Sequence, residues 1–120
     1  MLQVNQLSYT YPNEAQVVLD SINFQLESGK ILAIVGLSGC GKTTLLKLIY
    51  GLLAPTKGEI QWNSESIPDP KDVLVPGFKQ MKLVEQDFNL MPYIKVYENM
   101  QQHILHLTEE EQIISVVIWM

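Results

Sequence analysis

The sequence predicts a single α/β domain with a mixed sheet, and three observations support this prediction. Segments in which polar and apolar residues alternate come first, as in antiparallel strands with one solvated face. A short apolar segment, residues 31–35, then leads through a glycine-rich loop into a stretch with apolar residues at helical spacing. Further strand-like and helix-like segments follow, and no linker divides the 120 residues into two domains.

Three strands are expected before the glycine-rich loop. Residues 2–11 alternate and are rich in tyrosine, valine and leucine, and residues 12–15 are typical of a turn. Residues 21–30 also alternate, which predicts a half-buried strand that ends at a Ser-Gly turn. Residues 31–35 are apolar throughout and lie between glycines, so we expect a strand that is buried on both faces.

A helix and several shorter elements are expected after the loop. Residues 42–53 carry leucine and isoleucine at helical spacing, with Gly51 as a late helical position or the C-cap. Residues 58–62 predict a strand. The remaining elements are expected to be a loop over residues 63–77, a strand over 79–86, a helix over 93–107 and a last helix from Glu109, where Thr108 and Glu111 form a capping box.

The glycine-rich loop carries the pattern Gly-x-x-x-x-Gly-Lys-Thr from Gly36 to Thr43, which is the pattern of a phosphate-binding loop. Gly36, Gly39 and Gly41 are expected to adopt positive φ and to let the backbone approach phosphate oxygens closely. A helix that begins near Lys42 would direct its N-terminal N–H groups and its dipole at the same anion. An apolar strand enters the loop and a helix leaves it, a context that favours this interpretation over a chance glycine-rich turn.

The side chains of the motif have distinct chemical roles. Lys42 is expected to neutralise the β- and γ-phosphates, and Thr43 is expected to offer its hydroxyl to Mg²⁺. Cys40 occupies a free position and is interpreted as a passive small residue, although a thiol at a helix N-terminus can be reactive. The nucleotide-binding residues expected in this segment are Gly36, Leu37, Ser38, Gly39, Cys40, Gly41, Lys42, Thr43 and Thr44.

Charge and cysteine content limit other roles. The net charge of −5 lacks the basic excess of a sequence-independent nucleic-acid binder, and one cysteine cannot form an internal disulfide, which fits a reducing compartment. The start of the chain does not have the pattern of a signal peptide. The longest apolar run, residues 113–120, is far shorter than the roughly 20 residues that span a bilayer. We therefore expect a cytoplasmic protein that reaches a membrane through a partner.

Segments on both sides of the loop give the motif a wider context. LSYTYP precedes a strand that ends in ESGK, GEIQW follows the loop helix, and KLVEQDFNLMPYIKVYENM comes later. This order resembles the nucleotide-binding subunit of ATP-binding cassette (ABC) transporters over residues 1–105. The resemblance implies a P-loop NTPase core of the ABC ATPase type with an N-terminal antiparallel β subdomain. It also implies a transport-coupled ATPase that is held at the inner face of the membrane by transmembrane permease subunits.

The resemblance further implies roles for residues outside the loop. Tyr11, with Tyr9 as the competitor, matches the aromatic residue that stacks on adenine. Gln86 matches the glutamine that contacts Mg²⁺ and the attacking water, and its loop faces the permease. The implied cofactors are ATP and Mg²⁺, the implied metal ligands are Thr43 and Gln86, and the implied catalytic residues are Lys42 and Gln86.

The later part of the family's pattern is missing from these 120 residues. No LSGGQ-type signature occurs, nor a second apolar strand that ends in aspartate and glutamate, and His103 and His106 lie too early to be the late histidine. We therefore expect a chain truncated before the signature and Walker B strand, with residues 106–120 as an atypical tail. Such a chain would bind nucleotide without hydrolysing it.

In the full-length family, two nucleotide-binding subunits pair head to tail, so the resemblance implies a second such subunit as a partner. Two alternatives stay open. One is a small P-loop phosphotransferase, which the complete lack of arginine disfavours because such enzymes need an arginine-bearing lid. The other is a non-functional or misfolded fragment, whose uncharged, β-prone tail would be an aggregation hazard.

Overall fold

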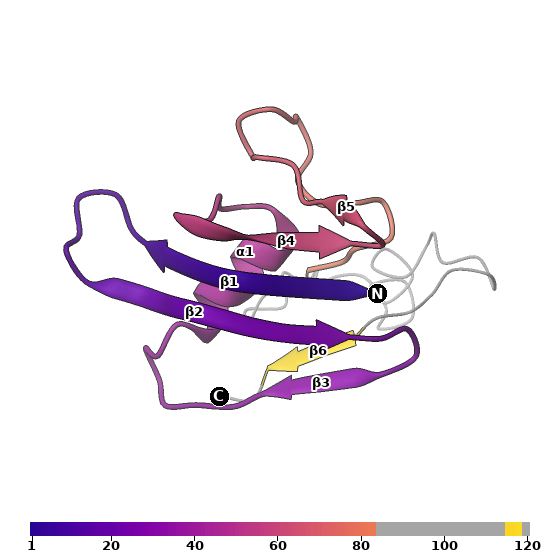
Figure 1. The fold of residues 1–120 in the computed structure, drawn as a ribbon, viewed down its shortest axis with the longest axis horizontal. Coiled ribbons are helices and arrows are strands. Elements are labelled where there is room, and N and C mark those ends of the chain that lie inside the picture. Colours follow the sequence, from indigo (N-terminus) through magenta and orange to yellow (C-terminus); the bar gives the residue numbers. More distant parts are fainter. Residues whose placement is uncertain (84–114, 119–120) are drawn as a thin grey trace, which may run out of the picture.

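The computed structural model describes residues 1–83 and the backbone of residues 115–118. Figure 1 shows how the elements in these residues are arranged. In chain order they are β1 (Leu2–Thr10), β2 (Val17–Leu26), β3 (Ile31–Ile34), α1 (Lys42–Tyr50), β4 (Lys57–Trp62), β5 (Glu65–Ser66) and β6 (Ser115–Ile118).

The described strands form two sheets. Four strands lie in the order β2-β1-β4-β5 and are antiparallel throughout, while β3 pairs with β6 in a separate parallel sheet of two strands. The expectation of an antiparallel β subdomain at the start of the chain is confirmed. The expectation of one mixed sheet is wrong for the described residues, because no ladder joins β3 to the four-stranded sheet.

Two bulges shift the side-chain alternation in the paired strands β1 and β2. In β1 the buried residues are Leu2 and Val4 before Gln6, and Leu7 and Tyr9 after it, so the buried positions change from even to odd. Gln6 has a φ of 47°, and both ladders of β1 shift register around it. A residue in left-handed conformation adds one position without a partner, which moves every later side chain to the opposite face.

The bulge in β2 lies opposite and balances the first. Ser21 has a φ of 51°, its N–H donates to Ser8 Oγ over 2.9 Å, and the Gln6 N–H donates to Asn23 Oδ1 over 2.8 Å. The side-chain alternation therefore shifts by one residue in both strands at the same place. Both halves of the hairpin present apolar side chains to one core. β2 begins at Val17, ahead of the predicted start at residue 21. The prediction began too late because regular alternation of polar and apolar residues is found only after the bulge.

The helix α1 packs its apolar face against the four-stranded sheet (Figure 1). It begins at Lys42, as predicted, and ends at Tyr50. Gly51 is the C-cap, with a φ of 82°, and its N–H donates to the Leu48 carbonyl. The core that the sheet and helix share consists of Leu2, Val4, Leu7, Tyr9, Leu19, Leu26, Leu45, Leu48, Ile49, Ile60, Trp62 and Met81.

The prediction that β3 is buried on both faces is wrong. Ile31 is 72% exposed and Val35, just after the strand, is 73% exposed, whereas Leu32 and Ile34 are half-buried against the core. An apolar run gives no information on which face is covered, because it fits one buried face as well as two.

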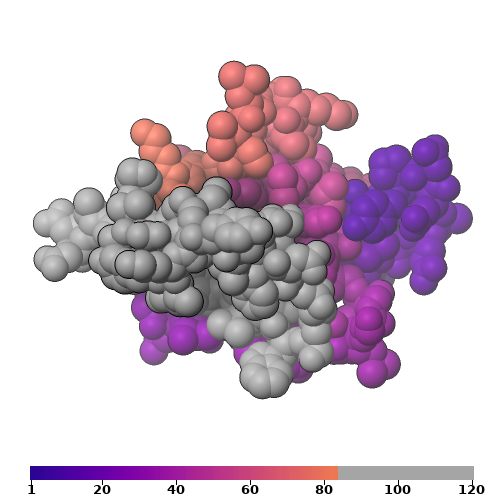
Figure 2. Space-filling view, turned by 180° about the vertical axis from the view of Figure 1, so that it is seen from behind, coloured from indigo at the N-terminus to yellow at the C-terminus, as the bar shows by residue number. Residues whose placement is uncertain are grey.

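The prediction of a strand over residues 79–86 is wrong for its described part. Residues 79–80 lie in a turn and 81–83 have no regular structure. The Met81 N–H donates to the Phe78 carbonyl over 2.9 Å, which closes the turn and places the Met81 side chain in the core. Before it, the segment after β4 follows the predicted loop apart from β5, and it projects from the surface with Leu74 and Val75 exposed (Figure 2).

Three further predictions lie outside the described residues. They are the helix over residues 93–107, the start of the helix from Glu109, and the end of the strand over residues 79–86. A helix from Glu109 that continued through residues 115–118 is ruled out, because these residues form the strand β6. In the described part of the chain, no helix has both the length and the apolar character needed to cross a membrane.

Candidate functional site

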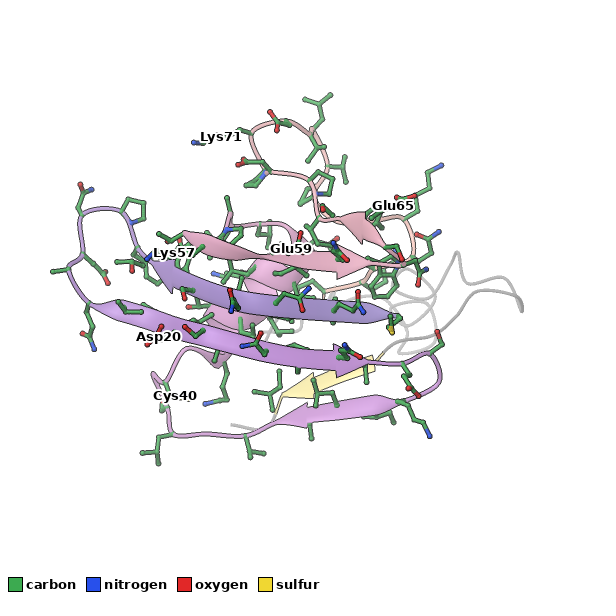
Figure 3. The ribbon with its side chains drawn as sticks, in the orientation of Figure 1. Asp20, Cys40, Lys57, Glu59, Glu65 and Lys71 are labelled. Atoms are coloured by element: carbon green, nitrogen blue, oxygen red, sulfur yellow. The ribbon has the colours of Figure 1, made fainter. Side chains whose placement is uncertain are left out.

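The glycine-rich loop connects the end of β3 to the start of α1, and Figure 3 shows Cys40 on it. Gly39 and Gly41 have φ values of 79° and 101°, as predicted. Gly36 was also expected to adopt positive φ, but it does not. A Cβ at Gly36 would lie 2.6 Å from Cys40 Sγ, so a larger residue there would require the Cys40 thiol to move.

Lys42 holds its ammonium group inside the loop. The side chain is only 6% exposed, and Nζ donates to the carbonyl of Gly36 over 2.8 Å and to that of Leu37 over 2.7 Å. Cys40 Sγ is 3.7 Å from the same nitrogen. The loop thus encloses a buried positive charge, whose only protein partners among the described residues are neutral. Such a charge favours an anionic ligand, because a buried cation gains most from a countercharge.

Gly41 is the N-cap of α1 and lies against β2. A Cβ at Gly41 would meet Leu19 Cδ2 at 3.0 Å and the Val18 carbonyl oxygen at 3.2 Å, so β2 would have to shift slightly, and the φ of 101° itself favours glycine. No side chain of the described residues caps the helix, and the Leu45 N–H donates to the Gly41 carbonyl over 2.9 Å. The earlier N–H groups of a helix have no intrahelical acceptor and suit an anion.

The two threonines after Lys42 have different surroundings. Thr43 is exposed, so its hydroxyl is accessible to a ligand or a hydrated metal. Thr44 is 6% exposed, and its Oγ1 lies 2.9 Å from the hydroxyl of Tyr11, where either group can donate. The structure therefore brings the end of β1 to the first turn of α1.

The two candidate aromatic residues are also distinguished by burial. Tyr9 is 5% exposed and belongs to the core, whereas Tyr11 is half-buried beside the helix N-terminus. Their rings meet edge to face, with centroids 5.0 Å apart and planes at 83°. Burial, together with the neighbouring Tyr11 and Glu14, raises the pKa of the Tyr9 phenol. Of the two rings, Tyr11 is the one that a ligand can reach.

Most of the predicted site lies in the described residues and is brought together by the fold. Gln86, His103 and His106 lie outside them. Within residues 1–83 and 115–118, no group of three or more histidine, cysteine and acidic side chains gathers as a metal site. Sequence reasoning did not identify Val18 and Leu19 beneath the loop or the bond between Tyr11 and Thr44, since neither leaves a local pattern.

The order of strand, glycine-rich loop with a buried lysine, and helix defines a P-loop nucleotide-binding fold. The family model described as ABC transporter matches residues 19–120, and the chain belongs to this family. It corresponds to part of the nucleotide-binding domain.

Curated relatives match most of the chain. The spermidine/putrescine import ATP-binding protein PotA of Borreliella afzelii is 33% identical over 82% of the chain and 27% of its own length. The phosphonates import ATP-binding protein PhnC of Bdellovibrio bacteriovorus is 38% identical over 82% of the chain and 38% of its own length. The chain therefore spans well under half of either relative.

Solved structures give the same picture. The ATP-binding cassette MJ0796, in a dimeric post-hydrolysis state bound to ADP and Pi, aligns with a TM-score of 0.66 and 26% identity over 93% of this chain and 52% of its own. The cbiO1 protein of Clostridium perfringens, part of the ABC transporter complex cbiONQ, aligns with a TM-score of 0.54 and 32% identity over 59% of this chain and 28% of its own.

Proposed function

We propose that this chain binds Mg-ATP as the nucleotide-binding part of an ABC transporter subunit. The observation that carries the proposal is the Lys42 ammonium, which is buried in the glycine-rich loop and held by two loop carbonyls. A triphosphate would replace these neutral acceptors with charged ones. Hydrogen bonds to charged groups are stronger, at about 1.5–3 kcal/mol each.

Mg²⁺ and the nucleotide fit the other groups of the site. We assign the exposed Thr43 hydroxyl as a ligand of Mg²⁺, which is a hard cation and prefers oxygen ligands. When bound, Mg²⁺ would neutralise charge on the β- and γ-phosphates. Tyr11 would supply an accessible ring for the adenine, and the burial of Tyr9 in the core favours Tyr11 over Tyr9 for this role. The loop residues 36–44 would cradle the phosphates.

The family gives the rest of the proposal. Gln86 would be the second metal ligand and, with Lys42, a catalytic residue, and its segment would face transmembrane permease subunits on the cytoplasmic side of the membrane. A second nucleotide-binding subunit would pair with this one head to tail. The two curated relatives are named for polyamine cations and for phosphonate anions, so we assign the motor role and no solute.

We further propose that these 120 residues bind ATP without hydrolysing it. They hold the phosphate loop but no LSGGQ-type signature and no aspartate–glutamate pair at the end of a second apolar strand. The rival view, a non-functional or misfolded fragment, predicts no nucleotide binding at all, whereas the ordered hydrogen bonds of Lys42 favour a loop that is ready to bind.

The test is a titration of the 120-residue chain with ATP and Mg²⁺, followed by calorimetry, for the wild type and Lys42→Ala. We expect the substitution to weaken binding by about 10- to 100-fold, the equivalent of one charge-assisted hydrogen bond. Lys71→Ala is the matched control, because the exposed Lys71 lies in the projecting loop and, within the described part of the chain, bonds only through its backbone N–H, to Asp69 Oδ1.

The same preparations are assayed for phosphate release from ATP. The proposal expects no release above that of Lys42→Ala. Equal ATP affinity in the wild type and Lys42→Ala would contradict the phosphate-loop role, and Lys42-dependent turnover would contradict the claim that these residues only bind.

A further inference from the structure

Thr44 lies next to the proposed metal ligand Thr43, yet its hydroxyl is already engaged. Thr44 Oγ1 is 2.9 Å from the Tyr11 hydroxyl, and the Thr44 side chain is 6% exposed. A ligand in the loop can still reach backbone N–H groups in the first turn of α1, which have no intrahelical acceptor. The side chain and the backbone of the first helical turn therefore have different partners.

The Tyr11 ring is held at two points. The bond to Thr44 fixes the hydroxyl end of the ring, and the edge-to-face contact with Tyr9, at 5.0 Å and 83°, fixes the ring plane. Tyr9 is itself anchored in the core, and Thr44 belongs to the helix that packs on the same core. Both restraints therefore come from rigid elements, although Tyr11 itself lies just beyond the end of β1.

We propose that the Thr44 hydroxyl is a positioning group that holds the Tyr11 ring in the plane required to stack on the base of the nucleotide. This inference rests on the proposed function, in which Tyr11 stacks on adenine. A ring that is oriented before the ligand arrives loses less conformational freedom on binding, so preorganisation raises affinity. The benefit belongs only to ligands that carry a base.

This restriction makes the proposal testable with two probes. ATP carries phosphates and a base, whereas inorganic tripolyphosphate carries only the phosphates. The ratio of the tripolyphosphate dissociation constant to the ATP dissociation constant, the base preference, reports what the Tyr11 ring contributes. General damage to the loop weakens both probes and leaves the base preference near its original value.

Three substitutions in the 120-residue chain test the Thr44 hydroxyl and the Tyr11 hydroxyl separately. Thr44→Val removes the hydroxyl and keeps the shape, Tyr11→Phe removes the hydroxyl and keeps the ring, and Thr44→Ser keeps the hydroxyl. We expect Thr44→Val and Tyr11→Phe each to lower the base preference about fivefold, the equivalent of one neutral hydrogen bond. The double variant should match either single variant, and Thr44→Ser should retain the base preference.

An unchanged base preference in Tyr11→Phe and Thr44→Val would overturn the proposal, and so would independent losses that multiply in the double variant. Tyr11→Phe alone decides the question if Thr44→Val does not fold, since Tyr11 is half-buried at the end of a strand. Failure of the wild type to bind either probe would instead overturn the proposed function. Wild-type binding of both probes with equal affinity would reject stacking by Tyr11.

Discussion

Gly36 and Cys40 form one packing unit in the phosphate loop. Gly36 does not need left-handed backbone, but the Cys40 thiol occupies the space in which its Cβ would lie, at 2.6 Å. The next neighbours, Lys42 Cδ and Cys40 Cβ, are 3.9 and 4.0 Å away. The close neighbour that a Cβ at Gly36 would meet is therefore a single sulfur atom.

A double substitution tests this dependence. Gly36→Ala should displace the Cys40 thiol toward Lys42, destabilise the chain by about 1 kcal/mol as overpacking does, and weaken ATP binding. Cys40→Ala removes the sulfur, so Gly36→Ala with Cys40→Ala should recover both properties. Urea denaturation and ATP titration measure the two effects. A double variant that is no better than Gly36→Ala would place the requirement for glycine elsewhere.

At the scale of the elements, the bulge at Gln6 directs the end of β1 toward the site. Without the extra residue, Leu7, Tyr9 and Tyr11 would lie on the face opposite to Leu2 and Val4, away from α1. The bulge depends on Gly58 in β4, where φ is 80° and a Cβ would lie 2.3 Å from the Gln6 carbonyl oxygen. One glycine in a neighbouring strand thus helps to place the proposed adenine-binding ring.

Substitution of Gly58 tests this role. Gly58→Ala should destabilise the chain by about 3 kcal/mol, because it adds a backbone collision to the strain of left-handed alanine. Gly29→Ala is the control for strain alone, since Gly29 has a φ of 73° with no atom within 4 Å of its Cβ position, and should cost about 1 kcal/mol. Urea denaturation measures both, and equal losses would argue against the collision.

Some of these elements could be predicted from the sequence, and others could not. The strands β1, β3 and β4, the loop and the start of α1 could be predicted, because short-range patterns specify them. The bulges could not, because periodicity assumes an unbroken strand, and each bulge depends on contacts with a partner strand. The same holds for the Tyr11–Thr44 bond, which joins residues 33 positions apart.

At the scale of the whole molecule, apolar side chains remain on the surface near the loop. Ile31, Val35 and Leu37 are 72%, 73% and 86% exposed, whereas Ile34 packs toward the core. Exposed apolar surface of this kind favours association. In Figure 3, β3 forms the lower edge of the view, below the four-stranded sheet.

Substitutions of two adjacent residues compare the exposed side of this segment with the side that packs on the core. Val35→Thr should reduce the binding of an apolar fluorescent dye and change the free energy of unfolding by less than about 0.5 kcal/mol, as expected for a surface position. Ile34→Thr should destabilise the chain by about 1–2 kcal/mol, because it removes packed apolar surface. Dye fluorescence and urea denaturation measure the two effects, and a large loss of stability in Val35→Thr would contradict the exposure of that side chain.

The strand order β2-β1-β4-β5 has a consequence for synthesis on the ribosome. The hairpin of β1 and β2 can close as soon as Leu26 has emerged, but the other edge of β1 is completed only by β4. Until residues 57–62 leave the exit tunnel, this edge of β1 presents unpaired backbone groups. A nascent chain that pauses between β2 and β4 would therefore be open to strand pairing with a neighbouring nascent chain.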